Sequence, residues 1–319
     1  MGYFTIVISI IVAFAAAVLF TMVEIPILKK KQAGQNIRED GPQSHLSKAG
    51  TPSMGGVAII LAVAVSTVAG LHYSIDTLIL LAVFLLFGLV GFLDDYLKVI
   101  KKNNLGLRAY QKFGLQALIA VALAVFLANS PLYGTEVFIP FVNIYVDFGG
   151  WYIPFIIFTV LAMVNAVNLT DGLDGLASGV TAASALFFAI TAMKILSTPA
   201  EIFSASILGA CLGFLVFNKN PAKIFMGDTG SLALGGGITI AAIIMKMELL
   251  LPIVGFVYVA EVLSVCIQVA SFKLTGKRVF KMSPLHHHFE LSGMKEKSVV
   301  FMFWMAAVIF AVIGFIIVH

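Results

Sequence analysis

Charged residues are scarce in this sequence. Asp, Glu, Lys and Arg make up 11% of the 319 residues, whereas a soluble domain carries about 25%. Hydrophobic residues reach 60%, and the mean hydropathy is +1.04. This composition excludes a soluble globular protein and predicts an all-α polytopic membrane protein. At roughly 20 apolar residues per span, about ten transmembrane helices use most of the chain, so residues 1–319 are expected to form a single integral membrane domain.

Cysteines and a signal peptide are also lacking. The two cysteines, Cys211 and Cys266, lie inside apolar runs, which indicates buried thiols and says little about the redox compartment. The first four residues include no basic residue, and the apolar run that follows is too long for a cleaved signal peptide. We expect this run to be an uncleaved first span.

Apolar runs mark the expected spans. They lie near residues 3–28, 53–70, 76–97, 110–129, 151–169, 175–196, 201–218, 230–246, 249–272 and 298–318. The connections expected outside are short, except for residues 130–150. Within that connection, two segments rich in β-branched and aromatic residues predict a small outer β-hairpin near residues 135–147, with a structural role.

The basic residues predict the orientation. Of the 20 Lys and Arg residues, all but Lys194 and Lys246 fall in the connections after the first, third, seventh and ninth expected spans. Lys and Arg favour cytoplasmic loops, so these connections are expected in the cytoplasm and both termini outside. The net charge of +4 therefore reflects the loops, and no nucleic-acid partner is expected.

Polar residues interrupt the apolar pattern between residues 165 and 176. Asn165, Asn168, Asp171 and Asp174 recur every three residues, so on a helix they form one slowly winding polar stripe. Polar groups at membrane depth are costly unless they face protein or a water-filled site. An ordinary Asp-Gly turn is the alternative, but two Asp-Gly pairs beside an amide-bearing helix end favour a site.

Two adjacent acids, Asp94 and Asp95, end the third expected span. They repel each other and lose solvation there unless a cation compensates them. A cap at the end of the span is the alternative, but acids at a helix C-terminus oppose the macrodipole. The pair therefore indicates that a cation or a cationic substrate group lies nearby.

A third acid, Asp228, begins the eighth expected span within the sequence Gly227-Asp228-Thr229-Gly230-Ser231. A helix N-terminus flanked by Gly, Thr and Ser suits phosphate, and an Asp there suits Mg²⁺ that itself bridges phosphates. A simple N-cap is the alternative. Beside the other acids, Asp228 becomes a metal candidate.

The last basic connection contains three consecutive histidines, His286, His287 and His288. A zinc site usually uses Cys partners or spaced histidines, and neither is evident nearby. Imidazoles that bind a diphosphate are favoured instead. Oxygen ligands, lysines and histidines on one face suit Mg²⁺-assisted chemistry on a phosphorylated substrate, and their depth at the headgroups suggests a lipid phosphate.

Four separated motifs resemble those of the polyprenyl-phosphate N-acetylhexosamine-1-phosphate transferases, and within that superfamily most closely those of the bacterial phospho-N-acetylmuramoyl-pentapeptide transferases (lipid I synthases). The motifs are Asp94-Asp95-Tyr96 and the stretches 165–175, 225–231 and 284–290, the last with an unbroken His-His-His-Phe-Glu. The first basic connection, residues 38–45 and 48–56, matches as well. The resemblance covers essentially all of the expected helices.

The resemblance implies a reaction and its partners. UDP-N-acetylmuramoyl-pentapeptide and undecaprenyl phosphate would give undecaprenyl-diphospho-N-acetylmuramoyl-pentapeptide (lipid I) and UMP, with Mg²⁺ as the cofactor. This is the first membrane step of peptidoglycan synthesis, and so belongs to cell wall biogenesis, cell shape and cell division. The resemblance also implies a homodimer in the bacterial plasma membrane, with the active site on the cytoplasmic side.

The resemblance also implies roles for individual residues. Asp228 would hold Mg²⁺, and Asp94 would deprotonate or position the attacking lipid phosphate, with Asp95 supporting the metal and the lysines. Asp94 and Asp95 are possible further metal ligands. The three histidines would contact the diphosphate or the muramoyl group. The expected substrate-binding residues, with Phe225 stacking on uracil and Asn218 as a polar support, are Lys48, Lys102, Lys112, Asn168, Asp171, Asp174, Asn218 and Phe225.

Other interpretations stay open. A solute transporter also uses intramembrane acids and broken helices, but its site would lie near the bilayer midplane. A sister transferase that uses UDP-N-acetylglucosamine would share the acid motifs. Direct attack by the lipid phosphate is favoured over a covalent aspartyl intermediate. Glu261 and Gln268 share one face of the ninth span and either bond neighbouring helices or line the cleft.

Overall fold

The computed structural model describes residues 2–31, 48, 50–70, 73–101 and 106–318. Its long helices are α1 (Gly2–Lys30), α2 (Gly56–Ala69), α3 (Ile75–Asp95), α4 (Ala109–Asn129), α5 (Tyr152–Thr170), α6 (Leu176–Lys194), α7 (Thr198–Asn218), α8 (Gly227–Ile244), α10 (Phe256–Thr275) and α12 (Glu296–Val318). The short helices are α9 (Leu251–Val254), α11 (Leu285–Leu291), the π-helical turn η2 (Tyr96–Ile100), and the 3₁₀ turns η3 (Gly149–Trp151) and η4 (Glu248–Leu250).

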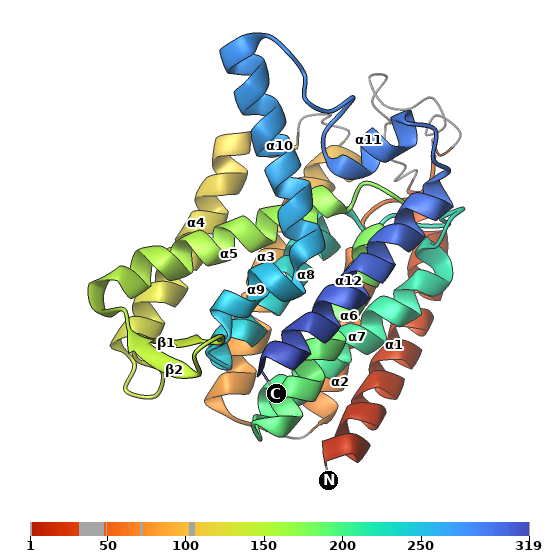
Figure 1. Cartoon of the computed structure of the whole chain (residues 1–319). Coiled ribbons are helices and arrows are strands. Elements are labelled where there is room, and N and C mark those ends of the chain that lie inside the picture. The colour runs from red at the N-terminus through yellow and green to blue at the C-terminus, as the bar shows by residue number, and fades with distance from the viewer. Residues whose placement is uncertain (1, 32–47, 49, 71–72, 102–105, 319) are drawn as a thin grey trace.

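Within the described ranges, nine helices are long and apolar enough to cross a membrane, which confirms the all-α polytopic architecture. The remaining expected span, near residues 53–70, is the shorter helix α2 of 14 residues. Figure 1 shows that α1 begins and α12 ends at the same end of the bundle. A chain whose two ends lie on the same side must cross the membrane an even number of times. Because nine of the described helices are long enough to span it, α2 is expected to be the tenth crossing.

Helix α8 lies at the centre of the bundle and is buried along almost its whole length. It packs against α2, α3, α5, α6 and α7. Two glycines bring neighbouring backbones onto it. A Cβ at Gly91 of α3 would lie 2.1 Å from the carbonyl oxygen of Asp228, and one at Gly56 of α2 would lie 2.0 Å from the nitrogen of Gly230. Because only glycine lacks this atom, α2 and α3 can touch the first turn of α8.

The predicted hairpin is confirmed. Strands β1 (Glu136–Ile139) and β2 (Ile144–Asp147) pair antiparallel, with Glu136 opposite Asp147 and Ile139 opposite Ile144. The hairpin lies at the lower left of Figure 1, at the end of the bundle away from α11. It is far from the helix ends that carry the three acids.

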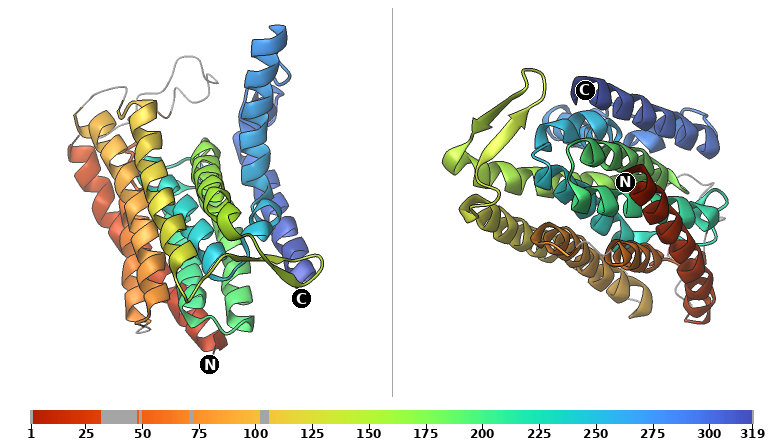
Figure 2. Two further views of the ribbon diagram at one scale, coloured as in Figure 1. Left: turned by 90° about the vertical axis from the view of Figure 1, so that its left-hand side faces the viewer. Right: turned by 90° about the horizontal axis from the view of Figure 1, so that it is seen from below.

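The ninth expected span is divided rather than continuous. The short helix α9 ends at Val254, and α10 begins at Phe256 after the break at Gly255. Figure 2 shows α10 standing beside the rest of the bundle and extending beyond it at the α11 end. Only a few residues of α10 are buried, and Glu261 is one of them. Helix α11, which carries the three histidines, was not expected from the sequence.

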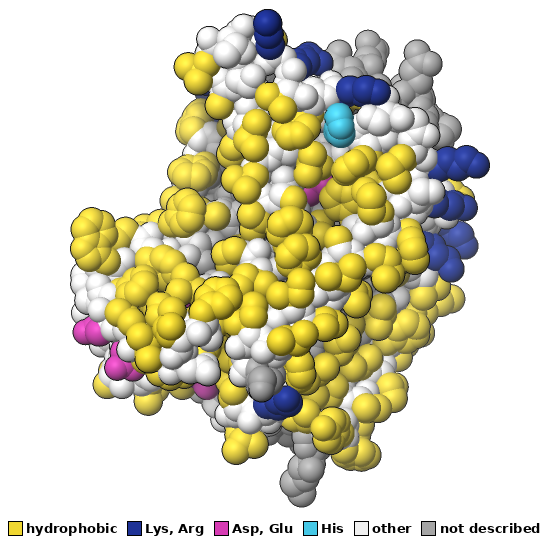
Figure 3. All heavy atoms as spheres, viewed as in Figure 1, with side chains coloured by type: hydrophobic (Ala, Val, Ile, Leu, Met, Phe, Trp, Pro, Cys, Tyr) yellow, Lys and Arg dark blue, Asp and Glu magenta, His cyan; other side chains and the backbone are white. Residues whose placement is uncertain are grey.

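The surface of the molecule has apolar sides and one basic end. Figure 3 shows hydrophobic side chains over the sides of the molecule, while most of the visible Lys and Arg side chains gather at the end where α11 lies. This distribution agrees with the loop charges of the sequence. It places the basic connections and the ends of α3 and α5 at one end of the bundle.

Candidate active site

Asp95, the last residue of α3, binds the first turn of α8. Its carboxylate accepts the backbone N–H groups of Asp228 at 3.1 Å and Thr229 at 2.8 Å, and the Thr229 hydroxyl at 2.6 Å. The first N–H groups of a helix have no partner within the helix, and the N-terminal end of its dipole favours an anion. Asp95 is 4% exposed. It therefore caps α8 from a neighbouring helix and orients Asp228.

Asp94 faces the connection between α3 and α4. Its Oδ1 accepts the N–H of Leu107 at 2.7 Å, while its Oδ2 lies 2.8 Å from the Lys98 Nζ and 3.5 Å from the Lys112 Nζ. Lys98 belongs to the π-helical turn η2 that continues α3, a helix form that is frequent at functional sites. Asp94 is 1% exposed, so its burial is compensated by hydrogen bonding and by two cations.

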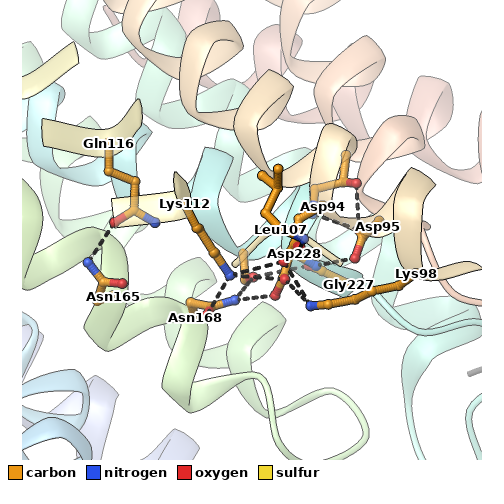
Figure 4. Close-up of polar contacts among 12 residues, drawn as sticks. Asp94, Asp95, Lys98, Leu107, Lys112, Gln116, Asn165, Asn168, Gly227 and Asp228 are labelled. Carbon is orange, nitrogen blue, oxygen red and sulfur yellow. Dashed lines mark hydrogen bonds and ion pairs between the residues drawn. The ribbon is translucent and has the colours of Figure 1, made fainter. Parts of the chain in front are cut away.

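Asp228 is the point where the ends of four helices meet (Figure 4). Its Oδ2 lies 2.8 Å from the Lys98 Nζ and 2.9 Å from the Lys112 Nζ. Its Oδ1 accepts the amide N–H of Asn168 at 2.7 Å, and Asn168 also donates to the Ser231 hydroxyl at 2.8 Å. The end of α3, the start of α4, the end of α5 and the start of α8 thus contribute to one charged cluster.

This cluster supplies one or two carboxylates, as many as Mg²⁺ commonly takes from a protein when phosphates and waters provide its other ligands. Asp94 and Asp228 are close enough for their carboxyl groups to interact. Among the described residues, no group of three His, Cys, Asp or Glu side chains forms a complete metal site. Mg²⁺ is commonly held by one or two carboxylates, with phosphates and waters completing the octahedron. The hydrogen bonds of Asp95 to α8 make it the least available ligand of the three acids.

The turn at residues 171–175 joins α5 to α6 and adjoins the cluster. Burial, followed by the negative charges of Asp228, Asp95 and Asp174, raises the pKa of Asp171 to about 8. A raised pKa favours the protonated form of the Asp171 carboxyl group, which can donate a hydrogen bond. The turn therefore places a carboxyl group with a raised pKa next to the charged cluster.

A second ionic cluster holds the other end of this turn. The Lys48 Nζ lies 2.7 Å from the Asp174 Oδ1 and 2.5 Å from the Glu296 Oε1. The Asn220 amide donates to the Asp174 Oδ2 at 3.1 Å and to the Glu296 Oε2 at 2.9 Å. The first basic connection, the turn, the α7–α8 connection and the start of α12 are thereby tied together.

The three histidines lie on α11, which contacts the turn at residues 171–175. The His286 ring is 1% exposed and packs against Gly172, where a Cβ would lie 2.1 Å from its Nε2. His287 and His288 are partly exposed. The backbone next to Asp171 is therefore the point at which α11 meets the acid-bearing helices.

Phe225 lies in the α7–α8 connection, and Asn218 is the last residue of α7. The Phe225 N–H donates to the Pro52 carbonyl at 2.8 Å, and its own carbonyl accepts the N–H of Gly55 at 2.9 Å. The Asn218 amide donates to the Ile224 carbonyl at 2.9 Å, and its oxygen accepts the Ser178 hydroxyl at 3.3 Å. Asn218 is therefore bonded within the protein and supports the connection that carries the partly exposed Phe225.

The structure thus brings most of the predicted site residues together at one end of the bundle, although their chemical roles stay predictions. Lys102 lies outside the described residues. Lys98, which was not among the predicted site residues, is the residue after α3 whose ammonium group contacts both Asp94 and Asp228. The spacing of four residues between Asp94 and Lys98, which brings side chains together on a helix, could have revealed it. Glu296 carried no comparable signal in the sequence.

Comparisons with known proteins identify the family of this chain. The model of glycosyl transferase family 4 matches residues 77–246, and phospho-N-acetylmuramoyl-pentapeptide-transferase signature 1 matches residues 48–60. The chain is 50% identical to the phospho-N-acetylmuramoyl-pentapeptide-transferase of Thermoanaerobacter sp. (strain X514), over 97% of this chain and 98% of that protein. It is 48% identical to the protein of the same name from Heliobacterium modesticaldum, over 96% of this chain and 95% of that protein. It is 50% identical to the protein of the same name from Clostridium kluyveri, over 97% of this chain and 98% of that protein.

Proposed function

Because the chain belongs to the phospho-N-acetylmuramoyl-pentapeptide-transferase family, an enzyme family of peptidoglycan precursor synthesis, we propose its substrates as follows. The donor is UDP-N-acetylmuramoyl-pentapeptide, and the acceptor is undecaprenyl phosphate. The products are lipid I and UMP, and the reaction requires Mg²⁺ at the cytoplasmic face of the membrane.

The observation that carries this proposal is that two ammonium groups are shared between the buried carboxylate of Asp94 and the partly buried carboxylate of Asp228. Lys98 and Lys112 each lie within 3.5 Å of both Asp94 and Asp228. Phosphoryl transfer depends on positioning and on stabilisation of negative charge on phosphate oxygens. A donor diphosphate and a lipid phosphate bring several negative charges together, and the ammonium groups of Lys98 and Lys112 could stabilise them.

In the transfer, an oxygen of the lipid phosphate forms a bond to the phosphorus that carries the sugar. The bond from that phosphorus to the bridging oxygen breaks, and its electron pair leaves with UMP. Asp94 would accept the proton of a monoprotonated lipid phosphate, and Lys98 and Lys112 would stabilise charge on the attacking and leaving oxygens. Asp95 would hold Asp228 in place through the first turn of α8.

The residues that would hold Mg²⁺ are Asp228 and, beside it, Asp94. When bound there, the ion would neutralise charge on the diphosphate oxygens and polarise the phosphorus. The oxygen atoms of Asp228 now bond Lys98, Lys112 and Asn168. These neighbours would keep the carboxylate ionised and oriented toward the phosphates.

The donor nucleotide would lie between the 171–175 turn and the α7–α8 connection. The partly exposed Phe225 supplies a ring for stacking on uracil. Asp171, whose raised pKa favours the protonated form, can then donate to a uracil carbonyl. Lys48, which bridges Asp174 and Glu296, supplies a cation near the nucleotide. Asn218 supports the α7–α8 connection through its hydrogen bond to the Ile224 carbonyl.

The test is a two-substrate assay on purified protein in detergent. UMP release should require both undecaprenyl phosphate and Mg²⁺, and a lipid product should form only with the muramoyl donor. Product from UDP-N-acetylglucosamine instead would favour the sister activity. Absence of UMP with either donor, together with solute uptake into proteoliposomes, would favour a transporter. The variant Asp228→Asn is the matched inactive control, because it keeps the shape of the side chain.

Direct attack and a covalent intermediate can also be separated. Both oxygens of Asp94 are occupied, one by the Leu107 N–H and one by lysine, which supports a role as base or orienting group. Direct transfer then needs no phosphorylated enzyme. Incubation with donor and Mg²⁺ but without acceptor, followed by mass spectrometry, would trap a phospho-sugar adduct on Asp94 or Asp95 if attack proceeded in two steps.

The cytoplasmic face and the oligomeric state have their own tests. The basic end of the bundle supports a cytoplasmic site (Figure 3). In intact cells, an impermeant maleimide should label a cysteine placed at Leu132 and leave one placed at Lys277 unlabelled. The background should be a variant without Cys211 and Cys266. The expected homodimer would be measured as particle mass in detergent.

A further inference from the structure

Glu261 of α10 holds His286 by both of its carboxylate oxygens. Its Oε1 accepts the His286 backbone N–H at 3.3 Å, and its Oε2 lies 3.1 Å from the ring Nδ1. Glu261 is 0% exposed and His286 1%. A carboxylate buried in a membrane-spanning helix is costly unless it is paired and hydrogen-bonded. The first turn of α11 supplies both partners, so Glu261 fixes the place of this turn.

The contact also determines which ring nitrogen of His286 carries a proton. A carboxylate oxygen accepts hydrogen bonds, so we assign Nδ1 as the donor, and the lone pair of a neutral ring is then on Nε2. His288 has the opposite arrangement, because its Nδ1 accepts the backbone N–H of Lys281 at 3.1 Å. Glu261 therefore gives His286 a different tautomer from its neighbour two residues along.

The other edge of the His286 ring lies against the 171–175 turn. A Cβ at Gly172 would lie 2.1 Å from the ring Nε2 and 2.7 Å from its Cε1. Nε2 is buried, and it has no hydrogen-bond partner among the described residues. A ring in contact with backbone on this edge leaves no space there for a sugar or a phosphate. In this position, the His286 ring contacts the backbone of the turn, and it can affect the site only by holding that backbone.

We propose that Glu261 is a positioning residue for the transfer reaction. Through His286 it braces the Asp171–Gly172 turn, so that His286 acts on donor binding by holding this turn and touches no substrate. His287 and His288, which are partly exposed, are left as the histidines that can reach a ligand. This inference rests on the proposed function, because the turn is part of the proposed nucleotide site.

Two substitutions of His286 separate bracing from direct contact. Asparagine places an N–H donor where Nδ1 lies and has no atom at Nε2, so His286→Asn keeps the contact with Glu261. Glutamine places its polar group near Nε2 instead, so His286→Gln loses that contact. Steady-state kinetics with both substrates should be measured for each variant, together with the thermal unfolding temperature.

Bracing predicts that His286→Asn stays within about 10-fold of the wild type in kcat/KM for the donor. His286→Gln and Glu261→Ala should lose about 10–100-fold, the usual loss when the outer partner of a functional histidine is removed. The loss should appear as a raised KM for the UDP-linked donor, with the KM for undecaprenyl phosphate unchanged. Equal losses in the two His286 variants, or the reverse order, would overturn the proposal, because Nε2 would then be the group that matters.

Gly172→Ala gives an independent check, since its Cβ should displace the His286 ring. It should raise the donor KM alone but add no further loss in the double variant Gly172→Ala/His286→Ala. An additive loss would contradict the ring–turn contact. Gly114→Ala on α4, where a Cβ meets nothing within 4 Å, is the matched neutral control. An inactive wild type would instead count against the proposed function.

Discussion

Lys98 gives the sharpest test of the charged cluster. Its Nζ lies 2.8 Å from both the Asp94 Oδ2 and the Asp228 Oδ2, so Lys98→Met removes a cation shared by two carboxylates while keeping the length of the side chain. Lys112 remains, at 3.5 Å from Asp94 and 2.9 Å from Asp228. We expect a folded protein with a severe loss of turnover.

The magnitudes follow from the exposure of the partners. The Lys98 side chain is 37% exposed, whereas that of Asp94 is 2% exposed. Exposed ion pairs contribute about 0.2–1 kcal/mol, and breaking a fully buried pair costs about 3–5 kcal/mol. For this intermediate case we expect a loss of about 1–3 kcal/mol in the free energy of unfolding. Removing one group that stabilises charge in the transition state should lower kcat about 100–1,000-fold.

The assay is UMP release at saturating donor, acceptor and Mg²⁺, with unfolding temperature measured in parallel. Lys101→Met is the matched control, because Lys101 is exposed in the same connection. A Lys98→Met enzyme with near-normal kcat would refute the reasoning that its ammonium group stabilises the reacting phosphates. A loss fully accounted for by unfolded protein would refute it as well.

Three further results are expected. Asp95→Ala should lower the free energy of unfolding by about 2–4 kcal/mol, because it leaves buried donors of α8 without an acceptor; an unchanged denaturation midpoint would contradict the cap. Because the pKa of Asp171 is raised to about 8 by burial and neighbouring acids, the folded state binds more protons than the unfolded state between about pH 4 and pH 8. Stability should therefore fall as pH rises through this range, and Asp171→Asn, compared by thermal unfolding from pH 5 to 9, should flatten the dependence. Phe225→Ala should raise the donor KM more than it lowers kcat, and equal effects on both would argue against stacking on uracil.

Much of the fold could be predicted from the sequence, because membrane spans follow from local hydropathy. The hairpin at residues 136–147 followed from local composition in the same way. The break at Gly255 and the short helix α11 did not, because neither changes the apolar pattern enough to be seen. Both depend on contacts with distant segments, such as the contact between Glu261 and His286.

The acids of the candidate site could be found in the same way, since a carboxylate at membrane depth is conspicuous. Their partners could not. From the sequence, Asp94 and Asp95 were not expected to act as caps, because they lie at the C-terminus of α3. In the structure, Asp95 caps the N-terminus of a different helix, α8. Likewise, the contact of Lys98 with Asp228, which lies far away in the sequence, could not be predicted from the sequence. Such assignments depend on packing between helices, which the sequence pattern does not specify.

The glycines at positions 56 and 91 have a consequence for how the enzyme responds to its surroundings. Because α2 and α3 meet α8 main chain to main chain, the separation of the acids is set by the least deformable part of the molecule. Exposed apolar side chains such as Leu89 and Phe92 belong to α3 itself, but they are not part of this main-chain contact. Changes in bilayer thickness or in lipid-facing residues should therefore loosen the outer helices well before they alter the geometry of the charged centre.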